Sequence, residues 1–129
     1  MSMPVALVDA PSLPTPTGPY ALATVATGSR ILHISGQVAN SAEAPEKQGA
    51  AEQAQACLDA IDTLLGAAGA QRQDVVRVGV FLTDMADRAE IARVREAFFG
   101  AHRPAATLVQ VAALAEPRFR VEIEATAVF

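Results

Sequence analysis

The chain has 129 residues, of which 51% are hydrophobic and 19% charged, so it is long enough for one domain with its own core and too apolar to be disordered. Its net charge of −4 at pH 7 disfavours binding to nucleic acid through phosphates, although an acidic average leaves room for a local basic patch. No apolar run reaches the roughly 20 residues of a membrane helix, and the first residues lack the cationic start of a secretion signal. We therefore expect a soluble, cytoplasmic protein with no membrane partner, in which residues 1–129 form a single domain.

The first third of the chain is expected to start irregularly and then form two strands. Four closely spaced prolines exclude a helix over residues 5–19, so residues 1–17 are expected to be an irregular or edge-like lead-in. Two strand-like runs, 20–26 and 30–35, are separated by a short segment with a glycine, which predicts a β-hairpin. The polar residues 40–48 predict a loop.

Two helices and a strand are predicted in the middle of the chain. Apolar residues recur at steps of three and four over 54–68, which indicates an amphipathic helix. Residues 74–83 are rich in β-branched side chains and predict a central strand. Asp87 and Glu90 have the spacing of a capping box and predict the start of a second helix, which Gly100 ends.

The last quarter of the chain predicts two further strands. The runs 105–114 and 119–129 are joined across a segment that contains Pro117, which suits a long hairpin. In the second run Glu122 and Glu124 alternate with apolar residues, so they share one face of the strand. We expect Glu122 to pair with Arg120, two residues away.

The predicted order is strand, strand, helix, strand, helix, strand, strand, which indicates an α+β domain. Two helices cover only one face of such a sheet, and the other face mixes apolar residues with glutamates. A surface of this kind is more stable against a partner than in water. We therefore expect a homo-oligomer whose subunits meet through their sheets.

Several short motifs, in their order and spacing, resemble the RidA family, also called YjgF or L-PSP, from about residue 18 to residue 127. The motifs include Gly18-Pro19-Tyr20, Ile34-Ser35-Gly36-Gln37, Phe81-Leu82-Thr83-Asp84, Phe98-Phe99, Pro104-Ala105 and Val121-Glu122-Ile123-Glu124-Ala125. The resemblance implies a chorismate-mutase-like α+β fold, with two helices on one face of a mixed sheet. It further implies a homotrimeric barrel with a small-molecule cleft at each subunit boundary. Well-understood members hydrolyse enamines and imines released by pyridoxal-phosphate enzymes.

The resemblance also assigns candidate site residues. Glu124 matches the carboxylate that handles protons during hydrolysis, whereas its pattern alone favours a solvated or salt-bridged strand glutamate. The positions matched to substrate binding are Tyr20, Ser35, Gly36, Ala106, Thr107 and Leu108. His33 shares a face with Ser35 and is a further candidate for proton transfer.

The sequence departs from the family where the substrate is anchored. Deaminases of amino-acid-derived imines have an arginine directly after Pro-Ala, and this chain has Ala106 there, so a standard 2-iminoacid substrate is not expected. Arg103, in the preceding loop, is the candidate replacement. The second helix has Ala92 and Arg95 where asparagine and tyrosine are common. Arg88 and Arg95 lie seven residues apart, a spacing typical of a solvated helix face.

No cofactor or metal site is expected. The single cysteine, Cys57, has helical spacing with apolar residues and is interpreted as part of the core. Three functions remain open: a trimer that binds and hydrolyses a small enamine or imine, a non-catalytic trimer that binds a small molecule or partner, and a ribonuclease. The ribonuclease is the least favoured, because the arginines are scattered and lack an aromatic platform for bases.

Overall fold

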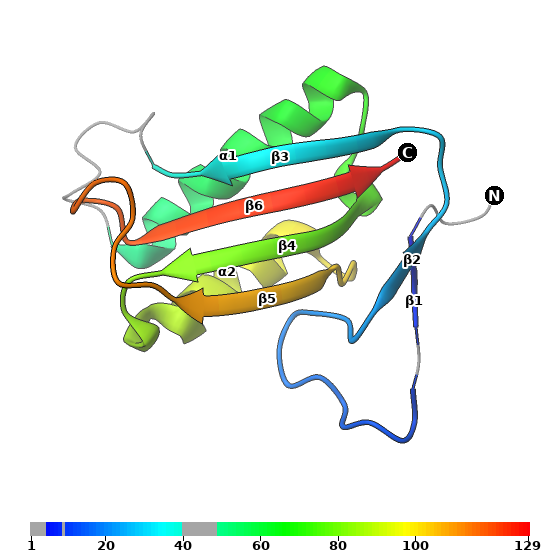
Figure 1. The fold of residues 1–129 in the computed structure, drawn as a ribbon, viewed down its shortest axis with the longest axis horizontal. Coiled ribbons are helices and arrows are strands. Elements are labelled where there is room, and N and C mark those ends of the chain that lie inside the picture. The colour runs from blue at the N-terminus through cyan, green and yellow to red at the C-terminus, as the bar shows by residue number, and fades with distance from the viewer. Residues whose placement is uncertain (1–4, 9, 40–48) are drawn as a thin grey trace.

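A computed structural model describes residues 5–8, 10–39 and 49–129 of the chain (Figure 1). The predicted loop at 40–48 and the first four residues of the lead-in lie outside the described residues. Within the described ranges, no helix has the length and apolar character needed to cross a membrane.

The described elements form one four-stranded sheet, one two-stranded sheet and two α-helices. In chain order they are β1 (Val5–Leu7), β2 (Thr24–Ala26), β3 (Ile31–Gln37), α1 (Ala50–Ala68), η2 (Arg72–Asp74), β4 (Val75–Leu82), η3 (Met85–Asp87), α2 (Arg88–Phe99), β5 (Ala105–Gln110) and β6 (Val121–Val128). The larger sheet has the strand order β3-β6-β4-β5, and β1 pairs with β2. Both α-helices lie behind the larger sheet in Figure 1, which confirms the predicted α+β fold with one covered face.

Both predicted hairpins are wrong in their pairing. The strand β2 pairs with β1, whereas β3 joins the larger sheet beside β6. The strand β5 pairs in parallel with β4, which separates it from β6. Turn residues indicate where the chain reverses, but the burial of each strand decides which neighbour it takes. The two strands with a fully buried side, β4 and β6, take the central places of the sheet.

The core lies between α1, α2 and the covered face of the larger sheet. Its largest fully buried side chains are Leu58, Ile61, Leu65, Leu82, Ile91 and Ile123, together with valines of β4 and β6. Burial of each such side chain contributes about 1.5–3 kcal/mol to folding. Both α-helices end at a glycine, as predicted for Gly100: Gly69 and Gly100 have φ of 84° and 62°, a region that glycine enters without the clash of a Cβ.

The start of α2 differs from the predicted capping box. The Asp87 side chain makes no capping hydrogen bond, and both of its oxygens instead accept from Nη2 of Arg120, at 2.9 and 3.0 Å. The predicted pair of Arg120 with Glu122 is therefore wrong. An aspartate at this position can satisfy a helix terminus or a neighbouring guanidinium, and the arginine on the approach to β6 lies close enough to take it.

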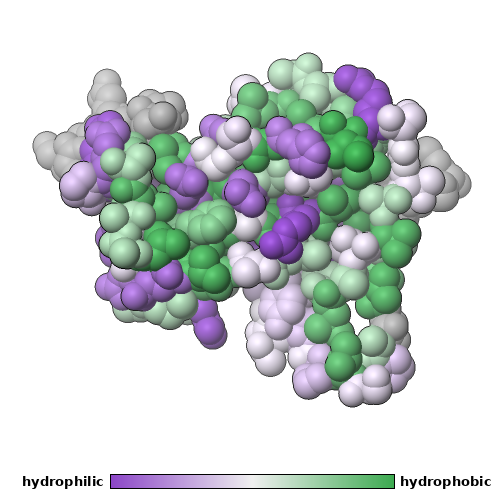
Figure 2. Space-filling model, in the orientation of Figure 1, coloured by the Kyte–Doolittle hydropathy of each residue, from purple (hydrophilic) through white to green (hydrophobic). Residues whose placement is uncertain are grey.

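The other face of the larger sheet is open. Arg77, Gly79 and Phe81 of β4 and Glu122 and Glu124 of β6 face this side, because they alternate with the buried residues of the same strands. Apolar side chains lie among them, including Ile31, which is 65% exposed, and Val109. Figure 2 shows this face as a mixture of apolar and polar patches.

Candidate active site

A cleft of about 610 Å³ lies along the outer edge of β5. Three segments line it: residues 17–20, residues 106–108 of the edge strand β5, and one side of α2. The first segment is held at this edge because Ala21 forms a parallel bridge with Ala105 and its N–H donates to the Pro104 carbonyl at 3.1 Å. Residues far apart in the chain thus meet at one edge of the sheet.

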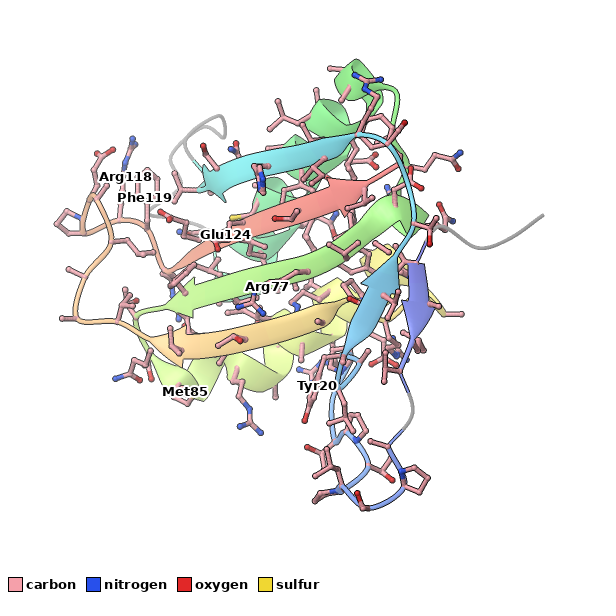
Figure 3. The ribbon with its side chains drawn as sticks, turned by 45° about the vertical axis from the view of Figure 1, so that its right-hand side comes forward. Tyr20, Arg77, Met85, Arg118, Phe119 and Glu124 are labelled. Atoms are coloured by element: carbon pink, nitrogen blue, oxygen red, sulfur yellow. The ribbon has the colours of Figure 1, made fainter. Side chains whose placement is uncertain are left out.

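Four of the predicted substrate-binding residues line this cleft together: Tyr20, Ala106, Thr107 and Leu108. Tyr20 is half-buried, and Figure 3 shows it beside the lower edge of the sheet. Ala106 and Leu108 also pack against the core, so one wall of the cleft is apolar. Thr107 accepts a hydrogen bond from Nη2 of Arg77 at 3.2 Å. The cleft therefore offers hydroxyl groups beside an apolar wall, a combination suited to a small organic ligand.

Glu124 lies outside this cleft in a single copy, on the open face of the sheet (Figure 3). Its cross-strand neighbour on β4 is Gly79. On the other side of β4, Gly79 pairs with Thr107 of β5. A Cβ on Gly79 would lie 2.9 Å from Cγ of Glu124 and 3.0 Å from its Oε2. The glutamate side chain therefore lies across β4 in the direction of Thr107 and occupies the space that glycine leaves free.

The second glutamate of β6 leans the other way. A Cβ on Gly36 of β3 would collide with the side chain of Glu122, so Glu122 lies across β3. The predicted residues Ser35 and Gly36, and the candidate His33, are also on β3. Because β3 and β5 are opposite edges of the sheet, one copy does not bring these residues to the cleft that contains Ala106.

Arg103, the candidate replacement for the missing anchor, does not line the 610 Å³ cleft. It donates to the carbonyl of Gly100 at 3.1 Å and to Oε1 of Glu96 at 3.4 Å. It also borders a second, smaller hollow of about 290 Å³ next to residues 20–22. Its guanidinium is therefore engaged at the end of α2.

Arg95 is the residue whose environment the sequence analysis missed. It was expected on a solvated face, but it lies inside the cleft on α2 and is only 4% exposed. Among the described residues it has no hydrogen-bond or ion-pair partner, and its Nε is buried without an acceptor. Burial lowers the pKa of its guanidinium from the usual value. Only the helical spacing of Arg88, Ala92 and Arg95 pointed to this position, because it places the three residues on the same side of α2.

Cys57 is a core residue, as predicted. It is fully buried, and its thiol contacts the carbonyl of Val121 at 3.7 Å. Burial, followed in size by the charge of Glu122, raises the pKa of the thiol to about 12, so it stays protonated at neutral pH. In the described part of the chain, no cluster of three histidine, cysteine, aspartate or glutamate residues could hold a metal ion.

Comparison with known proteins agrees with this fold along nearly the whole chain. The sequence profile of the family described as Endoribonuclease L-PSP matches residues 10–129. A RutC family protein of Leuconostoc mesenteroides subsp. cremoris is 36% identical over 127 residues, which cover 94% of this chain and 95% of the relative. The 2-iminobutanoate/2-iminopropanoate deaminase of Mus musculus is 35% identical over 125 residues, or 95% of this chain and 90% of the mouse protein.

A solved structure gives the same result in three dimensions. The crystal structure of YyfB, a protein of the conserved Rid family from Yersinia pestis, superposes with a TM-score of 0.87 at 31% sequence identity. The match covers 98% of this chain and 100% of the Yersinia chain. With a profile that spans most of its length and relatives above 30% identity, the chain belongs to the RidA family, also known as YjgF or L-PSP.

Proposed function

We propose that this protein binds a small enamine or imine in its cleft and hydrolyses it to a carbonyl compound and ammonia. The mouse relative carries the name of an imine deaminase, which supports this class of reaction. Ala106 offers only a methyl group, so recognition of the substrate differs from that by an arginine on β5. A trimer that binds such a ligand without turning it over is the alternative that the experiment below must exclude.

The observation that carries the proposal is the position of Glu124. Its carboxylate lies over Gly79 toward Thr107, which lines the cleft. In the reaction, the oxygen of water forms a bond to the imine carbon while Glu124 takes a proton from that water. The C=N electron pair moves to the nitrogen of the protonated imine as this bond forms. Glu124 then returns the proton to the amine nitrogen, and the C–N bond breaks as the new hydroxyl loses its proton to Glu124 and becomes the carbonyl, so that ammonia leaves. An enamine first gains a proton on carbon from the protonated form of Glu124 and becomes the protonated imine, which leaves Glu124 ionised for the attack of water.

We further propose that three copies join edge to edge. Within one copy Ser35 and Gly36 lie at the edge opposite the cleft, so they can approach a ligand beside Ala106 only if β3 of one copy lies near β5 of the next. Such a head-to-tail contact closes into a ring when the rotation between copies fits. The partly apolar open face would then be covered inside the ring.

The function can be tested with imines generated in the assay by an amino-acid oxidase or an amine oxidase, with semicarbazide as a competing trap. Hydrolysis by the protein lowers the yield of semicarbazone. We expect Glu124→Gln to reduce this effect by about 100-fold or more, since proton transfer by a placed side chain is worth roughly 10²–10⁴ in rate. Glu122→Gln is the matched control, because it makes the same change two residues away on a side chain that leans toward β3.

The proposal fails if the unaltered protein changes the fate of no imine, acidic or neutral, at high enzyme concentration. It also fails in its assignment of Glu124 if the Glu124→Gln and Glu122→Gln variants are equally active. A protein that binds the carbonyl product but shows no turnover would support the alternative of a binding trimer.

A further inference from the structure

Arg95 carries a charge that the described protein does not neutralise. The side chain comes from the middle of α2 and is almost fully buried, yet neither an acidic side chain nor a carbonyl oxygen among the described residues accepts from it. The nearest carboxylate along the helix, Glu96, is engaged by Arg103. Burial lowers the pKa of this guanidinium, but an arginine side chain keeps its proton at neutral pH because its ordinary pKa lies far above that range. A buried charge without a partner is strongly unfavourable, so an anion is expected to meet it.

The space in front of Arg95 is suited to such an anion. Arg95 lines the 610 Å³ cleft, and so do Ala92, one turn earlier on α2, and Ala106 on β5. Both neighbours end in a methyl group, so they leave room for a ligand and compete for none of the donors of the guanidinium. An arginine at position 106 would bring a second cation into this volume, which the alanine avoids.

We propose that Arg95 binds the carboxylate of the ligand in this cleft and that the substrate is therefore an anionic imine or enamine. The planar guanidinium presents two parallel N–H groups that match the two oxygens of a carboxylate. This inference rests on the proposed function for the nature of the ligand and adds the group by which the ligand is held. It also reverses the expectation that a protein with alanine at position 106 does not bind the carboxylate of a 2-iminoacid.

Other arginines near the cleft fit this role less well. Arg88 and Arg93 also line it, but both are exposed, so water already solvates their charge. Arg103 is turned toward Glu96 and the Gly100 carbonyl and borders the other hollow. A single buried guanidinium matches a singly charged carboxylate better than a doubly charged phosphate, although both anions can accept from it.

The test measures binding of 2-oxobutanoate by calorimetry, with butan-2-one as the neutral counterpart and inorganic phosphate as the second anion. We expect the unaltered protein to bind 2-oxobutanoate and to bind butan-2-one and phosphate more weakly. Arg95→Met should weaken 2-oxobutanoate binding by about 30-fold or more, as expected for removal of one member of a buried charge pair. Arg95→Lys should fall between the two, because an ammonium makes no planar pair of hydrogen bonds. Arg30→Met is the control of equal charge change, since Arg30 is exposed and stacks on Phe129, 4.7 Å from the ring centroid.

A second measurement separates ligand binding from a structural role. Methionine replaces an unpaired buried charge with an apolar chain, so Arg95→Met should melt at a higher temperature than the unaltered protein when no ligand is present. Added 2-oxobutanoate should raise the melting temperature of the unaltered protein and not that of the variant. A lower melting temperature for the ligand-free variant would overturn the proposal, because it would mean that the protein itself, through another copy or through residues outside the described ranges, supplies the partner of Arg95.

The remaining outcomes are equally decisive. Unchanged affinity of Arg95→Met for 2-oxobutanoate, or a loss of affinity in Arg103→Met instead, would overturn the assignment to Arg95. Tighter binding of phosphate than of 2-oxobutanoate would overturn the proposal that the group bound by Arg95 is a carboxylate. Binding that depends on Arg95 without any hydrolysis of imines would support this inference while the proposed reaction fails. Hydrolysis that depends on Glu124 but is unchanged in the Arg95 variants would support the proposed reaction and overturn this inference.

Discussion

The side chain of Glu124 occupies the space above Gly79, where a Cβ would lie 2.9 Å from its Cγ. Glycine costs a strand roughly 0.5–1 kcal/mol relative to alanine, so its presence in the middle of β4 calls for a local reason. The close approach of the glutamate supplies that reason. Gly79 therefore sets the direction of Glu124 without itself contacting a substrate.

The first prediction concerns this positioning. Gly79→Ala should force Glu124 into another rotamer and reduce imine hydrolysis about as much as Glu124→Gln, while thermal stability changes little. Steady-state rates should show no additional loss in the double variant, because both changes remove the same interaction. Gly66→Ala is the control, since a Cβ on Gly66 in α1 meets nothing within 4 Å. Full activity of Gly79→Ala would show that the orientation of Glu124 is unimportant.

Local features of the fold could be predicted from the sequence, whereas pairing could not. The repeat of three and four residues over 54–68 predicts α1 because a helix is a local structure. The parallel pairing of β5 with β4 depends on a crossover through α2, and no residue of β5 encodes it. The sequence also placed Glu122 and Glu124 on one face correctly, but their opposite directions follow from glycines on two other strands.

The candidate site follows the same pattern. Resemblance to the family picked out Tyr20, Ala106, Thr107 and Leu108, which the fold brings together in the cleft. The burial of Arg95 could not be read from the sequence, because spacing along a helix indicates which residues share a side and not which neighbour covers it. The cleft that Arg95 lines is bordered by β5, whose place in the sheet is itself a non-local property.

The second prediction concerns the ion pair of Asp62 with Arg72, which links α1 to η2 at 2.9 Å. The hydrogen bond from Arg72 lowers the pKa of Asp62. A lowered pKa in the folded state means that the pair stabilises the protein above the ordinary aspartate value of about 4 and stops doing so as the pH falls below it. Since both side chains are over a third exposed, Asp62→Asn should cost only about 0.5–1 kcal/mol at pH 7.

Urea denaturation at pH 7 and pH 3 measures this difference. The gap in unfolding free energy between the unaltered protein and Asp62→Asn should shrink at pH 3. Asp59→Asn serves for comparison, because Asp59 lies on the same helix and bonds to Gln55 instead of an arginine. A gap that is the same at both pH values would contradict the assignment of the effect to ionised Asp62.

The third prediction concerns Cys57. Its buried thiol, with a pKa raised to about 12, should not react with Ellman's reagent at pH 8 in the folded protein. A guanidinium chloride concentration of about 6 M unfolds most domains. Under this condition the same reagent should detect one thiol per chain. Rapid labelling of the folded protein would mean that α1 opens readily from the sheet.

The fourth prediction tests the arrangement of copies that the proposed site requires. Ile31 begins β3 at the edge of the sheet and is exposed in a single copy, so Ile31→Lys should leave the isolated fold intact. If β3 lies against the next copy, the same change buries a lysine at every seam of the ring, which is unfavourable without a partner. Light scattering should then give a mass of three times 13.4 kDa for the unaltered protein and a smaller mass for the variant.

Leu64→Lys is the control for this experiment, because Leu64 is an exposed leucine on α1, which covers the other side of the sheet. That variant should keep the mass of the unaltered protein. Loss of imine hydrolysis in Ile31→Lys together with loss of mass would indicate that residues of two copies act on one ligand, as the separation of Ser35 from Ala106 requires. A mass of 13.4 kDa for the unaltered protein would remove the basis for a shared site, because Ser35 and Gly36 could then never reach the cleft.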